Sequence, residues 1–122
     1  MNEPQTIKMS HHSLRVWGEA VALVKLVHGS PIGNAELRNQ ASRAAVSAGL
    51  NIVEGSVLVG NARGHHFRIA QGSAAEVVGA YELAAAIGER VPVQEVLARG
   101  NTVAAMLQGL LKGRRARLHQ AP

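Results

Sequence analysis

The chain has no cysteine and very few aromatic side chains. Without cysteine it has neither disulfide bonds nor zinc sites built on thiolates, and its composition fits a cytoplasmic protein. Aromatic residues make up 2% of the sequence, namely Trp17, Phe67 and Tyr81, so the core has to be built from Ala, Val and Leu. Small side chains bury little apolar area, at about 25 cal/mol per Å². Such a thin core favours self-association, which would bury further apolar surface.

Membrane and export signals are missing as well. Residues 1–10 lack the apolar segment of a signal peptide. The apolar stretches are interrupted by glycine and by charges, so no membrane-spanning segment is expected. No stretch alternates between apolar and polar residues with β-branched enrichment, so no strand is expected either.

Four stretches instead follow the helical period, with apolar residues spaced three and four apart. The breaker-rich segments 29–34 and 60–64 separate the first three stretches, and Gly88 with Pro92 separates the last two. The expected helices cover residues 13–28, 35–60, 65–87 and 93–114, and Ser13 is the expected N-cap of the first. Short connections between four helices predict an all-α fold, an antiparallel up-down-up-down four-helix bundle.

At 122 residues the chain fits one domain. Residues 1–12 are polar and aperiodic, and we expect a disordered N-terminal tail there. The bundle is expected to span residues 13–115, and residues 116–122 are expected to form a C-terminal tail.

A row of polar residues interrupts the second helical stretch. Arg43, Ser47, Asn51 and Glu54 recur at steps of four, four and three, so they lie on one side of a helix. In an antiparallel hairpin this row faces the third stretch, where Arg43 is within reach of Glu76 and Glu54 within reach of Ser73 or Arg68. We favour a structural polar network, within or between subunits, because a buried carboxylate needs a partner. The network comprises Arg43, Ser47, Asn51, Glu54, Ser73 and Glu76. The alternative is a binding or catalytic cleft that contains Glu54 and Glu76.

Signatures of catalysis and of metal or cofactor binding are not found. The sequence contains no HExxH, no GxSxG and no P-loop. Adjacent histidines point about 100° apart on a helix, so His65 and His66, like His11 and His12, are read as surface residues rather than metal ligands. Trp17 is expected in the core and His28 in the core or at its boundary. We therefore expect a protein that is not an enzyme and has no cofactor and no metal.

Positive charge is in excess, with 13 Lys and Arg against 8 acidic residues and a formal net charge of +5. A basic surface favours polyanions, and with so few aromatics any contact to RNA or DNA would be made to phosphate. The candidate nucleic-acid-binding residues are Arg63, Arg68, Lys112, Arg114, Arg115 and Arg117. The alternative is a structural or protein-interaction scaffold whose charge is incidental.

Three ordered motifs carry a resemblance to a known family. They are the segment Leu-Arg-Val-Trp-Gly-Glu-Ala at residues 14–20, the segment from Arg43 through Gly55, and Ala-Gln-Gly-Ser-Ala-Ala-Glu at residues 70–76. In order and spacing they resemble the four-helix-bundle proteins encoded in intervening sequences of large-subunit ribosomal RNA genes. Val53 replaces the alanine usual in that family, and the turn before the third helix is less basic.

The resemblance implies a ring-shaped homopentamer of four-helix bundles. It also implies similarity to the accessory protein of diversity-generating retroelements, which binds nucleic acid and a reverse transcriptase through its basic surface. The leading functional hypothesis is thus a non-enzymatic homo-oligomer that binds RNA, DNA or a nucleoprotein partner. Five copies would multiply a weak basic patch by avidity.

Overall fold

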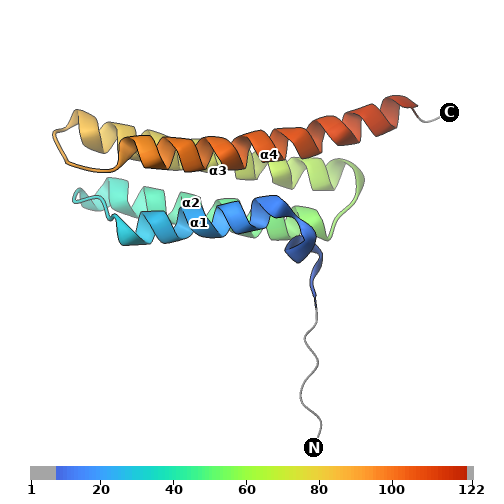
Figure 1. The fold of residues 1–122 in the computed structure, drawn as a ribbon, viewed down its shortest axis with the longest axis horizontal. Coiled ribbons are helices and arrows are strands. Elements are labelled where there is room, and N and C mark those ends of the chain that lie inside the picture. The colour runs from blue at the N-terminus through green and yellow to red at the C-terminus, as the bar shows by residue number, and fades with distance from the viewer. Residues whose placement is uncertain (1–7, 121–122) are drawn as a thin grey trace, which may run out of the picture.

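The computed structural model of the protein describes the backbone of residues 8–120 and the side chains of residues 8–113. A short 3-10 turn, η1 (Ser10–Ser13), precedes four helices, and no strand occurs in these residues. The helices are α1 (Arg15–Gly29), α2 (Ala35–Ser56), α3 (Gly60–Ala86) and α4 (Val93–Gln120). The predicted all-α fold is confirmed (Figure 1).

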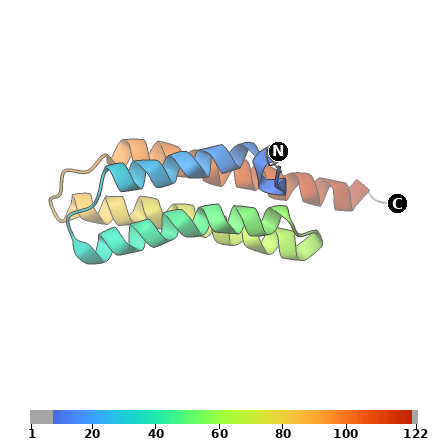
Figure 2. The ribbon, with the colours of Figure 1, turned by 90° about the horizontal axis from the view of Figure 1, so that it is seen from below.

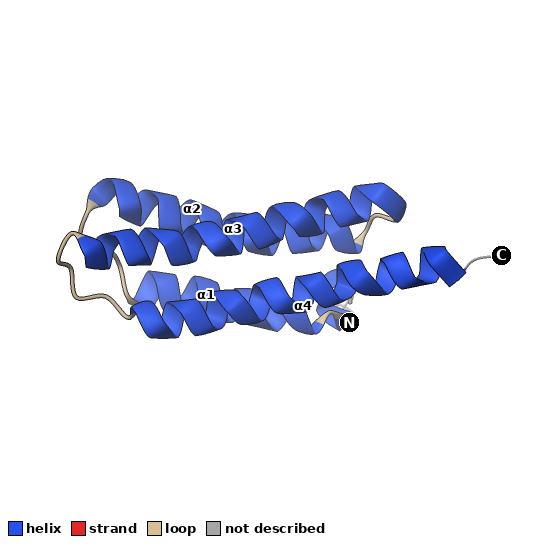
Figure 3. Ribbon diagram, turned by 90° about the horizontal axis from the view of Figure 1, so that it is seen from above, coloured by secondary structure: helices blue, strands red, loops and turns tan. Residues whose placement is uncertain are grey.

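Each helix packs against two neighbours and runs antiparallel to them, in the cyclic order α1, α2, α3, α4. Seen from below, α1 lies beside α4 and α2 beside α3 (Figure 2). The two termini and the α2–α3 turn lie at one end of the bundle, and the other two connections lie at the opposite end (Figure 3). This is the predicted up-down-up-down topology, and it gives the bundle two chemically different ends.

The turn between α2 and α3 lies earlier than predicted. It consists of residues 57–59, and the breaker-rich segment 60–64 forms the first turns of α3 instead. Gly60 takes a φ of 64°, which suits glycine at the sharp entry to the helix. Placing segment 60–64 in the helix lets Arg63 reach the end of α2 and lets Phe67 enter the core at 1% exposure. Tertiary packing here outweighs the local turn propensity.

The chain ends also differ from the expected boundaries. Leu14 is the N-cap of α1, and Ser13 donates a hydrogen bond to the Ser10 carbonyl within η1. Residues 10–12 of the predicted tail thus form a turn, whereas residues 1–7 lie outside the described part. At the other end the helical backbone of α4 continues to Gln120, across much of the predicted tail, and residues 121–122 lie outside the description.

The predicted break between the third and fourth helices at Gly88 and Pro92 is confirmed. Gly88 follows the C-cap Ile87 of α3 with a φ of 96°. Pro92 stands directly before α4, and its carbonyl accepts the Val96 amide hydrogen.

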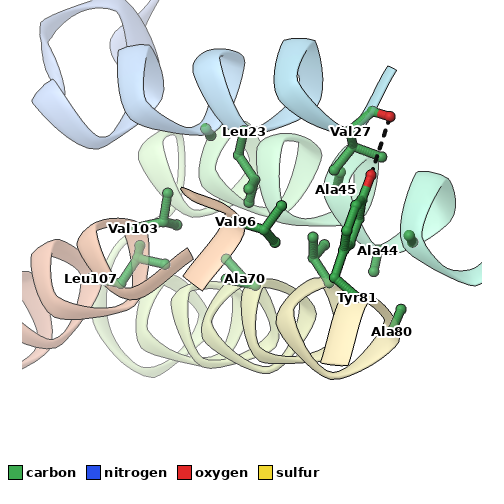
Figure 4. Close-up of a cluster of buried hydrophobic side chains, with 14 of the residues drawn as sticks. Leu23, Val27, Ala44, Ala45, Ala70, Ala80, Tyr81, Val96, Val103 and Leu107 are labelled. Carbon is green, nitrogen blue, oxygen red and sulfur yellow. Dashed lines mark hydrogen bonds between the residues drawn. The ribbon is translucent and has the colours of Figure 1, made fainter. Parts of the chain in front are cut away.

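The core consists of small side chains, as the composition requires. Nine of the 21 buried apolar residues are alanines, and Tyr81 and Phe67 are the largest buried side chains. In Figure 4, Leu23, Val96 and Leu107 point into the interior of the bundle, and Tyr81 lies beside Val27, Ala44 and Ala45. Alanine allows the helices to approach closely, but it adds little buried area per residue.

Trp17 and His28, both on α1, lie in different environments from those predicted. Trp17 is only partly buried; it packs against the edge of the core and contacts the His11 ring edge-on at 4.6 Å between centroids. His28 is exposed rather than buried or at the boundary. Both deviations arise because α1 turns its Leu23 and Val27 side chains, not these residues, towards the core.

A polar clamp joins the two connections at the end opposite the termini. The Glu89 carboxylate accepts the amide hydrogens of Gly33, at 2.5 Å, and Asn34, at 3.0 Å, just before α2. Arg38 donates to the carbonyl oxygens of Ile32 and Gly33. A carboxylate at a helix N-terminus also complements the helix dipole.

Candidate interaction surfaces

A chain of polar side chains crosses the interface between α2 and α3. The hydroxyl oxygens of Ser47 and Ser73 lie 2.9 Å apart, and Ser73 is the buried polar residue of the core region, at 7% exposure. The Asn51 amide nitrogen donates to the Ser47 carbonyl at 2.9 Å and to its hydroxyl at 3.2 Å. Three of the six residues assigned to the network therefore meet.

His66 completes this chain, although sequence reasoning reads it as a plain surface residue. Its Nδ1 lies 2.9 Å from the Asn51 Oδ1 atom. We call Ser73, Ser47, Asn51 and His66 the polar seam. A signal for His66 is available in retrospect, since Asn51 and His66 stand at nearly equal distances before and after the turn at residues 57–59.

The other three assigned residues, Arg43, Glu54 and Glu76, are exposed. Among the described residues none of them forms an ion pair, so the expected pairs of Arg43 with Glu76 and of Glu54 with Arg68 are not formed. At about 100° per residue, Arg43 and Glu54 lie roughly 60–80° around α2 from Asn51, on its solvent side. A four-residue spacing places side chains on the same face of one helix, but it does not bring them within reach of the neighbouring helix.

Arg63 has a structural partner at the end of α2. Its guanidinium donates to the carbonyl oxygens of Gly55 and Ser56 at 3.3 and 3.4 Å and lies 4.9 Å from the centre of the Phe67 ring. These carbonyls belong to the last turn of α2, where the Gly55 carbonyl also accepts the Leu58 amide hydrogen, so Arg63 acts as a further cap. The Arg63 guanidinium is thereby held against the end of α2.

Of the remaining candidates for nucleic-acid contact, the structure describes the side chains of two. Arg68 and Lys112 are exposed. The side chains of Arg114, Arg115 and Arg117 lie outside the description, although their backbone belongs to α4.

Charge is segregated along the bundle. The half of the bundle that carries the termini receives four helical cations, Arg15, Arg63, Arg68 and Lys112, and two carboxylates, Glu19 and Glu54. We call it the basic end. In the opposite half the described cations and carboxylates balance, five against five: Lys25, Arg38, Arg43, Arg90 and Arg99 against Glu36, Glu76, Glu82, Glu89 and Glu95. The folded chain therefore presents its excess positive charge in one direction.

A second surface is apolar. A hollow of about 340 Å³ lies between α1 and α2, and we call it the α1/α2 groove. Val46 and Leu50 stand on its rim at 44% and 58% exposure. The groove is lined by Trp17, Ala20, Val21, Val24, Lys25, Val46, Gly49 and Leu50. Sequence reasoning missed it, because Trp17 and Val21 fit the apolar stripe of a buried helix.

The described residues offer no candidate metal site and no candidate membrane span. In residues 8–120 no group of three or more acidic or histidine side chains is arranged to hold a metal ion. None of the helices in that part of the chain combines the length and apolar character needed to cross a lipid bilayer.

Comparison with protein families gives a match that covers the bundle up to the last turns of α4. The profile of the 23S rRNA-intervening sequence protein family matches residues 12–109. The chain belongs to the 23S rRNA-intervening sequence protein family. All three sequence motifs, at residues 14–20, 43–55 and 70–76, fall inside the matched region, so the resemblance expected from them is confirmed. Searches of curated proteins and of solved structures give no match.

Membership of the 23S rRNA-intervening sequence protein family accounts for the helical fold but assigns no chemistry to single residues. Of its motif residues, Ser47, Asn51 and Ser73 join α2 to α3, while Arg43, Glu54 and Glu76 face solvent. The motif therefore combines packing positions with surface positions.

Proposed function

We propose that this family member is a non-enzymatic assembly protein that self-associates through the α1/α2 groove and binds nucleic acid at its basic end. The observation that carries the proposal is the segregation of charge: cations from α1, α3 and α4 gather at one end, where carboxylates are few. Concentrated positive charge attracts the phosphate backbone irrespective of sequence. The partner is RNA or DNA, free or within a nucleoprotein.

Self-association strengthens such a surface. A monomer with few exposed cations binds phosphate weakly, but copies held in one assembly engage a long polyanion together. The α1/α2 groove supplies apolar surface for this contact, and exposed apolar surface of this kind marks interaction sites. A ring of five chains, as in the related bundles named above, would gather five basic ends.

A binding measurement at several salt concentrations tests the proposal. Arg68→Gln with Lys112→Gln removes two cations at the basic end, and Arg90→Gln with Arg99→Gln removes two from the opposite half, outside the α1/α2 groove. Each variant loses two positive charges, so the two variants have equal net charges. We expect the first to weaken binding to duplex DNA and RNA and to lower the salt dependence of log K by about 1.8 for DNA, and the second to have little effect.

Neutralising Arg114, Arg115 and Arg117 is expected to add to the loss from the first variant. Equal losses from both double variants would show that only net charge matters and would contradict a dedicated basic end. No binding by the wild-type protein at low salt would contradict the nucleic-acid function altogether. It would leave the alternative, a scaffold that binds proteins through its α1/α2 groove.

A further inference from the structure

The hydrogen bonds of Asn51 determine which ring nitrogen of His66 carries a hydrogen. The Asn51 Nδ2 atom faces the Ser47 carbonyl oxygen, which can only accept, so this atom is the NH₂ group. The other amide atom, Oδ1, must then be the one 2.9 Å from His66 Nδ1. An amide oxygen also only accepts, so Nδ1 carries a hydrogen. When the imidazole is neutral, its Nε2 therefore holds the lone pair.

The polar seam also holds the ring in place. His66 is partly buried, and its Nδ1 is joined through Asn51 and Ser47 to Ser73, which is buried between α2 and α3. With Nδ1 committed to Asn51, Nε2 is the ring nitrogen left for a partner outside the seam. A preorganised side chain loses little conformational entropy when it binds.

His66 belongs to the basic end. On α3 the His65 ring lies 5.5 Å away between centroids, Arg63 stands one turn before His66, and Arg68 stands one turn after His65. Glu54 stands on α2, one turn beyond Asn51, and Lys112 stands near the end of α4. Arg63 is engaged with the carbonyls of α2, so a phosphate group bound on this side of α3 needs a further donor.

We propose that the His66 Nε2 atom is a phosphate contact of the basic end, formed only when the imidazole is protonated. The inference rests on the proposed function and adds its regulation. A neutral Nε2 presents a lone pair to phosphate oxygens, whereas a protonated Nε2 donates a charge-assisted hydrogen bond. Binding of nucleic acid therefore takes up a proton at His66 and strengthens as the pH falls.

Fluorescence anisotropy with labelled single-stranded RNA and duplex DNA, from pH 5.5 to 8.5 at constant ionic strength, tests this. His66→Asn places an amide NH₂ near the position of Nδ1, which preserves the bond to Asn51, and removes Nε2. His65→Asn is the matched control on the neighbouring residue. From pH 8 to pH 6 we expect the wild-type protein and His65→Asn to tighten by about tenfold more than His66→Asn, the effect of one charge-assisted hydrogen bond.

A second measurement does not depend on a variant. Nitrogen NMR of the wild-type histidines at pH 8 is expected to show His66 with hydrogen on Nδ1, and nucleic acid added at pH 6 is expected to shift its Nε2 signal. A His66 with hydrogen on Nε2 at pH 8, or an unchanged pH dependence in His66→Asn, would overturn the inference while leaving the proposed function intact. Failure of the wild-type protein to bind either probe would overturn both.

Discussion

At the scale of single residues, Tyr81 shows how one polar atom joins distant parts of the chain. Its side chain is fully buried, and its hydroxyl lies 2.7 Å from the Ser30 carbonyl and 3.3 Å from the Val27 carbonyl, at the end of α1 (Figure 4 shows the bond to Val27). These carbonyls have no helical partner because α1 ends there. Burial raises the pKa of the Tyr81 hydroxyl above its ordinary 10.0.

Tyr81→Phe is expected to lower the free energy of unfolding by about 1 kcal/mol at neutral pH, since it leaves buried carbonyl oxygens without a donor. The raised pKa means that the folded protein favours the protonated hydroxyl. Tyr81 therefore contributes its full stability below pH 10, and this contribution is lost as the pH rises through the folded-state pKa. Urea unfolding between pH 7 and 12 measures both effects.

The variant supplies its own control for the pH dependence. The difference in stability between wild type and Tyr81→Phe is expected to be constant from pH 7 to 9 and to shrink at higher pH, because other titrating groups are common to both proteins. A difference that stays constant up to pH 12 would contradict the assigned role of burial.

At the scale of elements, the close contact between α2 and α3 depends on one glycine. A Cβ atom at Gly55 would lie 2.5 Å from the Phe67 ring and 3.3 Å from the Arg63 carbonyl. Phe67 is buried and lies beneath the Arg63 guanidinium, so it has little room to move. Close helix packing at this position therefore offsets the cost of a glycine inside a helix. At Gly49 a Cβ would make only an ordinary 3.6 Å contact with Trp17.

Gly55→Ala is expected to destabilise the protein by about 1–3 kcal/mol through overpacking, despite the better helix propensity of alanine. Gly72→Ala is the matched control, since Gly72 is exposed inside α3 with no atom within 4 Å of the added Cβ. That change is expected to stabilise by about 0.5–1 kcal/mol. Thermal unfolding of the two variants measures the contrast, and a stabilising Gly55→Ala would refute the close-packing argument.

At the scale of the whole molecule, a core of small side chains and an open apolar groove point to the same conclusion. The bundle buries nine alanines, each with little area, and leaves Val46 and Leu50 in solvent beside the groove. Further apolar burial is available on this face. The exposed cations Arg68 and Lys112 lie on α3 and α4, so assembly through α1 and α2 is compatible with phosphate contacts there.

Leu50→Glu is expected to dissociate the assembly, because it places a charge on the rim of the α1/α2 groove. Leu83→Glu is the matched control: Leu83 has the same 58% exposure but lies on α3, outside the groove. Light scattering after size exclusion is expected to give wild type and Leu83→Glu a multiple of the 12.8 kDa chain mass, five for a pentamer, and Leu50→Glu a single chain. A monomeric wild-type protein, or equal dissociation of both variants, would contradict the groove as the interface.

Much of the architecture is readable from local pattern. The 3.6-residue period of apolar side chains predicts four helices, the scarcity of aromatics predicts an alanine-rich core, and three ordered motifs indicate the family. Gly88 and Pro92 mark the α3–α4 connection correctly because their backbone preferences are intrinsic. All these features depend on residues close together in the chain.

Other features depended on how the helices meet. The sequence places Arg43, Ser47, Asn51 and Glu54 on one side of α2, but only the rotation of α2 against α3 decided that Ser47 and Asn51 find partners and the two charged residues do not. The same packing placed segment 60–64, with Arg63, in α3, so the turn lies at residues 57–59, and it brought the cations of the basic end together. Periodicity specifies a face of one helix, whereas the partner of a side chain depends on the rotation and register of two helices, which side chains from distant segments decide together.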